Sequence, residues 1–259
     1  LPLDAEKNVA GVAGLAMLKA HNPQLGFEIR IEKNIKPGSG IGSSAASAAG
    51  TVAGINYLLG NPFTNKELIP FAMEGERLAC GSAHADNVAP ALLGGFTLVR
   101  DTNPLDICAL PTPLELVATV IHPKIEVKTA DARAVLKKRV TLEKAISQWG
   151  NVGALVSSLY EEDYDLLSRS LIDGIVEPTR AILIPHFSEL KAACKEAGAL
   201  GSGISGSGPS VFALSRGMPA ANTVAKAMQS VLEKTNIPFD IHVSPVKKTG
   251  VSFIEDLLT

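Results

Sequence analysis

The chain has 259 residues with a formal net charge of −2 at pH 7, and 46% of its residues are hydrophobic but only 5% aromatic. This length suffices for one large or two modest domains, and the core must be built mainly from Ala, Val, Leu and Ile. The balanced charge argues against a nucleic-acid or anionic-membrane partner, while three scattered cysteines and the lack of a long apolar run favour a cytoplasmic protein.

In the first part of the chain, apolar spacing predicts helices and strands in mixed order. Apolar residues three and four apart predict a helix from Val9 to about His21. Phe27, Ile29 and Ile31 alternate with charged residues and predict a half-buried strand. The further elements expected up to residue 100 are a small-residue helix at 43–59, a helix at 65–80, a short helix at 84–93 and a strand at 96–100.

Residues 101–113 contain Pro104, Pro111 and Pro113 and predict a linker between two domains, 1–110 and 111–259. Beyond it, the expected elements are a strand at 116–121, helices near 129–136 and at 142–159, a helix at 186–196, a strand at 210–214, a helix at 219–233 and a strand at 239–243. Helices and strands alternate without a repeating period, so we expect an α+β fold.

The most informative segment runs Lys36-Pro-Gly-Ser-Gly-Ile-Gly-Ser-Ser-Ala-Ala46, between a predicted strand and a predicted helix. Alternate glycines allow the backbone N–H groups to turn toward one point, and the first turn of the helix offers further unpaired N–H groups and a positive dipole end. The segment predicts a triphosphate-binding loop with a serine hydroxyl near Mg²⁺, the alternative being a Gly-rich turn capped by serine. It is not a Walker A sequence, and Ser43 stands where the dinucleotide fingerprint has its third glycine.

A second Gly-rich segment spans residues 201–209 and contains a literal GxGxxG. A predicted helix precedes it and a predicted strand follows, which is the reverse of the dinucleotide-binding order. We therefore expect it to let the backbone approach a ligand or the first loop closely. The alternative is a tight connection that binds nothing.

These two loops, in this order, resemble the ATP-phosphate motif and the C-terminal glycine motif of the GHMP kinase superfamily. Ile41 departs mildly, since Leu or Met is usual there. Between the loops, the segment His84-Ala-Asp-Asn-Val-Ala-Pro90 resembles one that is characteristic of the homoserine kinases in this superfamily. The resemblance implies two domains: an N-terminal S5-like α+β domain and a C-terminal ferredoxin-like α/β plait.

The resemblance also implies an activity, the ATP-dependent phosphorylation of the hydroxyl of L-homoserine in threonine biosynthesis, with Mg²⁺ as the metal ion. By the resemblance, Ser44 and Glu76 hold Mg²⁺, and Glu74 is the neighbour that could be confused with Glu76. The implied nucleotide-binding residues are Lys36, Pro37, Gly38, Ser39, Gly40, Ile41, Gly42, Ser43, Ser44, Ala45 and Ala46, with Asn8 near the adenine.

Homoserine offers a carboxylate, an ammonium and a hydroxyl. The guanidinium groups of Arg133 and Arg180 suit the carboxylate and match the superfamily's substrate-binding positions, although surface solvation alone also accounts for an arginine. Asn87 can donate to or accept from the hydroxyl or ammonium. His84 either contacts the substrate or is structural. Gly206 of the second loop completes the implied substrate site.

The implied catalytic residues are Ser44, Glu76, Asp86 and Asn87. In one hypothesis Asp86 accepts the proton of the substrate hydroxyl. In the other, the γ-phosphate itself accepts that proton and no side chain acts as the base.

The superfamily's earlier motif, on an N-terminal hairpin, has no match here, and we expect the chain to begin after that hairpin. Two alternative functions remain at this point: another GHMP kinase acting on mevalonate-type or sugar substrates, and a non-catalytic binding protein on the same scaffold. In the first, Arg133 and Arg180 would bind phosphate groups. A homodimer is an expectation taken from the superfamily alone.

Overall fold

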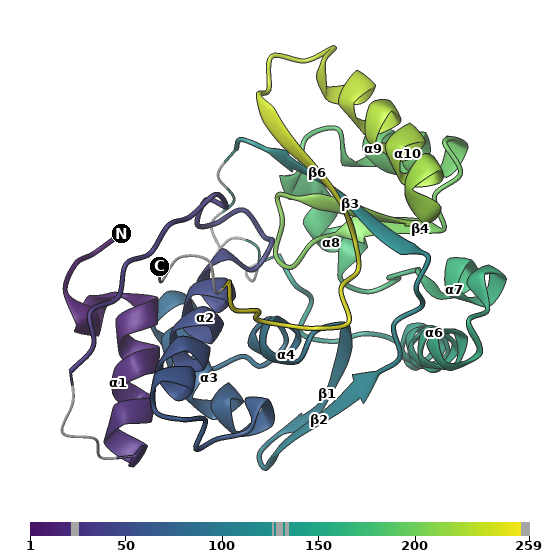
Figure 1. Cartoon of the computed structure of the whole chain (residues 1–259). Coiled ribbons are helices and arrows are strands. Elements are labelled where there is room, and N and C mark those ends of the chain that lie inside the picture. The colour runs from purple at the N-terminus through teal and green to yellow at the C-terminus, as the bar shows by residue number, and fades with distance from the viewer. Residues whose placement is uncertain (22–25, 126, 128–131, 133–134, 255–259) are drawn as a thin grey trace. The chain divides into compact units, whose positions relative to one another are not determined.

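The computed structural model describes residues 1–21, 26–125, 127, 132 and 135–254 (Figure 1). The chain divides into two compact units. The first contains residues 1–36, 42–110 and the chain from 247 on, and the second contains residues 37–41 and 111–246. The glycine loop at 37–41 therefore belongs to the second unit, although the chain on both sides of it belongs to the first.

Helices make up most of the first unit. They are η1 (Ala5–Lys7), α1 (Val9–His21), α2 (Ser43–Leu58), α3 (Asn65–Cys80) and α4 (Val88–Leu93), and α1, α2 and α3 pack side by side (Figure 1). The core between them uses small side chains such as Ala48, Ala49 and Val52, all fully buried, so the helices approach closely. The sequence predictions of the first three α-helices agree with these bounds to one residue, but α4 begins four residues later than expected.

Local signals explain why α3 was predicted correctly. Thr64 accepts from the N–H of Glu67, and the Glu67 side chain accepts from the N–H of Thr64, which forms a capping box. The helix ends at Gly81, whose φ of 73° only glycine adopts readily. Start and stop are thus both encoded by residues adjacent to the helix.

The predicted linker at 101–113 is wrong for residues 101–110, although the two compact units do divide between residues 110 and 111. Six of its thirteen residues form β2 (Leu105–Leu110), which pairs antiparallel with β1 (Phe96–Thr102), and its first two residues are the end of β1. Pro104 lies in the turn between the strands and Pro111 lies just beyond β2. A strand tolerates proline at its ends, since no ladder hydrogen bond is lost there. The prolines therefore bracket a strand here.

The predicted strand at 27–31 is also wrong. In the described residues the segment 26–33 belongs to no strand, and Phe27 and Ile31 are only half-buried. Alternation of apolar and charged residues favours an extended backbone. A strand additionally needs a ladder partner, which the pattern of a single segment does not supply.

The second unit is built on a four-stranded antiparallel sheet with the order β4-β5-β3-β6 (Figure 1). Its strands are β3 (Leu116–Pro123), β4 (Gly201–Ile204), β5 (Val211–Arg216) and β6 (Phe239–Pro245). Helices α9 (Phe187–Glu196) and α10 (Gly217–Leu232) pack on the sheet, with Leu190, Val224 and Met228 buried against it. This strand order and chain sequence are those of a ferredoxin-like plait.

Four shorter or peripheral elements complete the second unit: α6 (Leu142–Glu161), α7 (Tyr164–Ser170), α8 (Glu177–Arg180) and η2 (Ala181–Leu183). The sequence predicted α6, α9, α10, β3, β5 and β6, but not α7 or α8. It was wrong to treat 201–208 wholly as a loop, because Gly201–Ile204 pairs with β5 as β4. The predicted helix near 129–136 lies outside the described residues. None of the described helices is both long and apolar enough to cross a membrane.

Candidate functional site

The N-terminus of α2 is prepared for an anion. Gly38, Gly40 and Gly42 all have φ between 75° and 79°, so the chain reaches the helix through three left-handed residues. The first-turn N–H groups have no acceptor within the helix, and Gly42, at the N-cap, has no side chain to satisfy them. Free N–H groups and the positive end of the helix dipole therefore stand together at Ser43 and Ser44.

Glu76 of α3 belongs to this end of α2. Its side chain is only 3% exposed, and its Oε1 atom is buried with no hydrogen-bond partner among the described residues. The Ser44 side chain lies beside the same carboxylate and acts to lower its pKa. An orphaned carboxylate oxygen beside a serine hydroxyl is a donor set that suits a hard cation such as Mg²⁺.

Burial raises the pKa of the Glu76 carboxyl, because the charged form loses hydration. The Ser44 side chain opposes this rise, and the negative charge of Asp86 adds to it. The nearby charges of His84 and Lys33 act in the lowering direction. The ionised Glu76 carboxylate is therefore unfavourable to the folded state, and a bound cation would offset that free-energy cost.

Lys33 is a site residue that the sequence reasoning missed. Its Nζ donates to the Ser43 carbonyl at 2.6 Å and to the Ser47 hydroxyl at 2.7 Å. Burial lowers its pKa, and the charge of Glu76 counteracts that shift. The residue lies ten positions before Ser43 and in no recognisable motif. Only the structure reveals this lysine, because it places the Lys33 ammonium beside the first turn of α2.

The segment 84–87 also lies at this site. His84 and Asp86 both act electrostatically on Glu76, and the amide oxygen of Asn87 is 3.9 Å from the position that a Cβ on Gly42 would take. His84, Asp86 and Asn87 are all exposed. The His84 ring is within 2.8 Å of the Ser82 hydroxyl, and Asp86 accepts from the N–H of Asn87 at 3.1 Å. The first unit thus brings together Ser44, Glu76 and this segment, as expected. Glu74, by contrast, pairs with Arg77.

The glycine loop 37–41 packs against the loop 205–210 of the same unit. The Ser205 hydroxyl donates to the Gly40 carbonyl at 2.8 Å, and the Ser210 hydroxyl donates to the Ser39 carbonyl at 2.6 Å. A Cβ on Gly40 would lie 2.6 Å from the carbonyl oxygen of Gly208, which leaves room for glycine alone. The expectation that the second Gly-rich segment lets backbone approach the first loop is confirmed.

Ser39 and Gly206 complete this pair of loops. The Ser39 side chain is 1% exposed, and its hydroxyl has no hydrogen-bond partner in the described part of the chain. The Gly206 carbonyl accepts from an Nη atom of Arg180 at 3.1 Å. Arg180 also donates through Nε to the Ala132 carbonyl, likewise at 3.1 Å. These bonds use two of the five guanidinium N–H groups and hold the fork at the loop.

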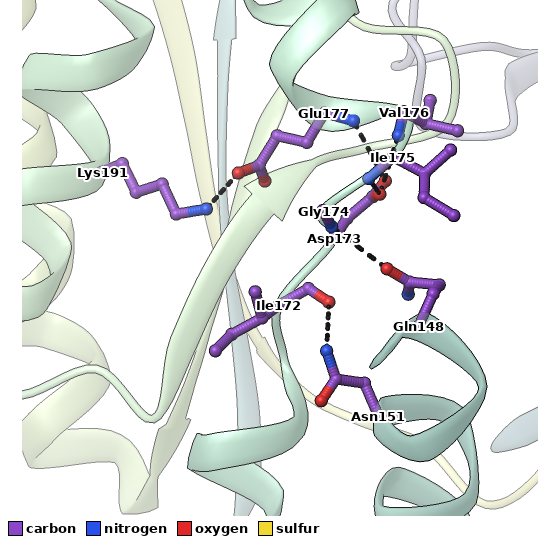
Figure 2. Close-up of polar contacts among 9 residues, drawn as sticks. All are labelled: Gln148, Asn151, Ile172, Asp173, Gly174, Ile175, Val176, Glu177 and Lys191. Atoms are coloured by element: carbon purple, nitrogen blue, oxygen red, sulfur yellow. Dashed lines mark hydrogen bonds and ion pairs between the residues drawn. The ribbon is translucent and has the colours of Figure 1, made fainter. Parts of the chain in front are cut away.

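A hydrogen-bonded scaffold sets the position of the helix that carries Arg180 (Figure 2). The Asp173 carboxylate accepts from the N–H groups of Ile175, Val176 and Glu177 at 2.8–3.1 Å and so caps the first turn of α8. Glu177 pairs with Lys191 of α9.

Two amides of α6 fix the loop that precedes α8. Gln148 accepts from the N–H of Gly174 at 3.0 Å, and Asn151 donates to the Ile172 carbonyl at 3.1 Å (Figure 2). This scaffold has no sequence motif, and Asp173 before a proline-containing turn was its only signal.

The other two predicted residues have different outcomes. Arg133 lies outside the described residues. Asn8 accepts from the N–H of Ala10 at 3.0 Å and donates to the Pro2 carbonyl at 2.7 Å, so it caps the start of α1. Its contact with adenine stays a prediction. In the described residues no cluster of three or more His, Cys, Asp or Glu side chains forms a metal site of protein ligands alone.

Comparisons with known families identify the family of this chain. Residues 8–95 match the family described as GHMP kinases N terminal domain, and residues 142–234 match GHMP kinases C terminal. The chain belongs to the GHMP kinase family and has its two-domain α+β fold.

Individual relatives are more specific. A homoserine kinase of Chloroherpeton thalassium is 51% identical over 96% of this chain and 81% of that protein. A homoserine kinase of Methanococcus vannielii is 35% identical over 99% of this chain and 82% of that protein. The crystal structure of homoserine kinase from Cytophaga hutchinsonii superposes with a TM-score of 0.93 at 53% identity, covering 96% of this chain and 79% of that one.

More distant structures share the fold alone. Mevalonate kinase of L. major superposes with a TM-score of 0.67 over 93% of this chain and 78% of that one, at only 15% identity. The fold therefore does not distinguish among GHMP substrates, whereas the relatives named above at 35–53% identity are homoserine kinases.

Proposed function

We propose that this protein transfers the γ-phosphoryl group of ATP to the hydroxyl of L-homoserine, giving O-phospho-L-homoserine for threonine biosynthesis. Phosphoryl transfer depends on the buried Glu76 carboxylate beside Ser44 at the open N-terminus of α2. The choice of homoserine rests on relatives of that name at about 50% identity over nearly the whole chain. The reaction belongs in the cytoplasm, as the composition and the scattered cysteines favour.

The phosphates of ATP bind at the start of α2. Phosphoryl transfer demands positioning and charge neutralisation more than covalent chemistry. The N–H groups from Gly40 to Ser44 donate to phosphate oxygens, and the dipole of α2 and the Lys33 ammonium add positive charge. Lys33 also fixes the first turn through its bonds to the Ser43 carbonyl and the Ser47 hydroxyl, so the donors keep their direction.

Ser44 and Glu76 hold Mg²⁺ in this proposal. Mg²⁺ takes few protein ligands, and phosphate oxygens and water molecules fill its remaining coordination positions. The unpartnered Oε1 of Glu76 is the observation that fits this role, because a buried anionic oxygen without a donor otherwise costs free energy. When bound, the ion neutralises charge on the phosphates.

Arg180 binds the carboxylate of homoserine, with Arg133 as the second proposed guanidinium. Two bonds to backbone carbonyls hold Arg180 at Gly206, so its remaining N–H groups point in a set direction and lose less entropy on binding. Asn87 serves the hydroxyl or ammonium. Asp86 is exposed, and it accepts the hydroxyl proton only in the reading that requires a base.

A coupled ADP-release assay on the full-length protein tests the substrate. L-Homoserine should support turnover, and D,L-mevalonate and simple alcohols of the same length should not. The alcohols lacking the amino-acid head serve as the matched control, because they retain the reactive hydroxyl. Turnover on mevalonate but not on homoserine would overturn the proposal.

A further inference from the structure

The second unit contains a cavity that is separate from the proposed kinase site. It is lined by residues between 168 and 202, from α7 to β4, and its volume is about 830 Å³. None of the residues assigned above to nucleotide, metal ion or substrate lines it. Most of the lining is apolar, and the polar part is limited to one glutamate, two lysines and three serines. A cavity of this size with an apolar wall and few polar groups has the usual form of a small-molecule site.

The apolar lining extends from the protein interior to the surface. Phe187 is buried, whereas Ile172 and Ile182 of the same lining are 55% and 76% exposed. Large apolar side chains that line a cavity and still contact water are stabilised when an apolar group covers them. The cavity therefore favours a ligand with an apolar body.

Two lysines of α9 give the cavity its positive charge. Phe187, Lys191 and Lys195 follow one another at intervals of four residues, so they lie on one face of this helix. The Lys191 ammonium is 5.9 Å from the centre of the Phe187 ring, next to the apolar part of the lining. Lys195 is exposed and forms no ion pair with the residues that the structure describes.

Glu177 is the only acidic residue of the lining, and it is already paired. One of its carboxylate oxygens accepts a hydrogen bond from Lys191 (Figure 2), and its side chain is only 12% exposed. The other oxygen packs against Gly203, 3.1 Å from the position that a Cβ there would take. The lining therefore offers two ammonium groups to an anion but no unpaired carboxylate to the ammonium of a ligand. An amino acid would bring a third ammonium group next to these two, which is unfavourable.

We propose that this cavity binds a small amphipathic monocarboxylate that has no amino group. Its carboxylate lies at Lys191 and Lys195, and its apolar body, of about ten carbon atoms, covers Phe187 and the neighbouring isoleucines. Lys191 can serve Glu177 and the ligand together, because an ammonium group has three N–H donors and Glu177 takes one of them. Binding therefore leaves the ion pair between α8 and α9 intact.

Helix α8 couples this cavity to Arg180. Glu177 lines both this cavity and a smaller one of about 310 Å³, whereas Pro178 lines only the first and Arg180 only the second. A ligand packed against Pro178 restrains α8, so less freedom remains for Arg180 to lose when it binds a carboxylate. The ligand and L-homoserine should therefore strengthen each other's binding by the same factor. This coupling rests on the proposed role of Arg180 in the kinase site.

A titration followed by NMR signals of the ligand tests binding to the full-length protein, with 4-phenylbutyrate as the probe. We expect a dissociation constant on the order of 0.1–1 mM for a ligand of this size. Two matched compounds divide the probe into its parts: 4-phenylbutan-1-ol keeps the apolar body and acetate keeps the carboxylate. Both should bind at least tenfold more weakly, and 2-amino-4-phenylbutyrate, which adds an ammonium group, at least fivefold more weakly.

Two substitutions place the probe in this cavity. Ala192→Trp, at an exposed lining position, should fill the cavity and weaken binding at least tenfold. Lys195→Gln should weaken it at least threefold, and Lys226→Gln, which removes an exposed charge from α10 outside the lining, should leave it unchanged. Melting temperatures equal to that of the parent would show that the variants are folded. The proposal is overturned if the alcohol binds as tightly as the acid, or if neither Ala192→Trp nor Lys195→Gln weakens binding of the probe.

The same titration with saturating L-homoserine tests the coupling through α8. L-Homoserine should lower the dissociation constant of the probe at least threefold, and the probe should lower that of L-homoserine by the same factor. Equal constants with and without L-homoserine would overturn the coupling. If L-homoserine itself does not bind, while the probe binds and responds to the two substitutions, the proposed kinase substrate is wrong and the monocarboxylate site stands.

Discussion

The substitution Glu76→Gln distinguishes the effect of the buried carboxylate on folding stability from its proposed role in binding Mg²⁺. The substitution keeps the shape of the side chain and removes its charge. Glu76 is 3% exposed, and its Oε1 has no partner in the described residues, so the ionised form loses hydration without full compensation. The variant should therefore be more stable than the parent in metal-free buffer and much less active with Mg²⁺.

The expected magnitudes follow from the burial. Each pKa unit by which burial raises a carboxyl corresponds to about 1.4 kcal/mol of unfavourable folding free energy at neutral pH. The Ser44 hydroxyl and the charge of Lys33 return part of that cost. We expect a gain of about 1 kcal/mol in the free energy of unfolding, or roughly 2–4 °C in melting temperature for a chain of this size. Loss of one prepositioned electrostatic group should lower kcat by about 10²–10³.

The stability gain should depend on pH. Because the folded-state pKa of Glu76 is raised above its ordinary value of 4.5, the parent is relatively most stable below 4.5 and loses stability as pH rises through the raised pKa. The difference between Glu76→Gln and the parent should therefore be largest near pH 7 and should vanish as pH falls toward 4.5.

Thermal unfolding in EDTA and ADP release with Mg²⁺ measure the two effects. Glu74→Gln is the control: Glu74 lies two residues away on α3, is partly exposed, and pairs with Arg77. It should change neither quantity substantially. Normal turnover by Glu76→Gln would refute the assignment of Glu76 as the metal ligand. So would the combination of an inactive Glu74→Gln variant and a Glu76→Gln variant that is less stable than the parent at pH 7.

Three further substitutions test other parts of the site. Gly40→Ala should destabilise the loop pair and raise KM for ATP at least tenfold, since a Cβ would lie 2.6 Å from the Gly208 carbonyl oxygen; Gly38→Ala, with a similar φ but open space, should cost less in both assays. Arg180→Lys should raise KM for homoserine at least tenfold with a smaller change in kcat, because the planar fork is lost; an unchanged KM would remove Arg180 from the substrate site. Asp86→Asn should lower kcat modestly, and a loss beyond about a thousandfold with unchanged KM would require a committed base.

Sequence reasoning was most successful where adjacent residues decide the structure. The capping box at Thr64 and the glycine at position 81 define α3, and the Gly-rich approach to Ser43 defines the start of α2. The left-handed glycines of the loop at 38–42 follow from the same kind of local signal, whereas phosphate binding there stays a prediction. The pairing of Ser44 with Glu76 came from the resemblance, and its burial came only from the structure.

Features that depend on distant segments could not be predicted. The sequence Gly201–Ile204 has little strand propensity and becomes β4 because β5 offers a ladder. The alternating segment 27–31 has strand propensity, but it pairs with no other strand among the described residues. Lys33 and the bond between Ser210 and Ser39, 171 residues apart, belong to no motif. The sequence likewise predicted α6 as a helix, but which of its residues are exposed is known only from the packed structure.

Phosphorus NMR of the reaction with ATP, Mg²⁺ and L-homoserine tests the central claim most directly. The full-length protein should produce a phosphate monoester on the side-chain oxygen of homoserine, with one ADP per ester and at least a hundredfold lower rate for Glu76→Gln. Absence of that ester from a correctly folded protein, or its formation at an undiminished rate by Glu76→Gln, would contradict the account.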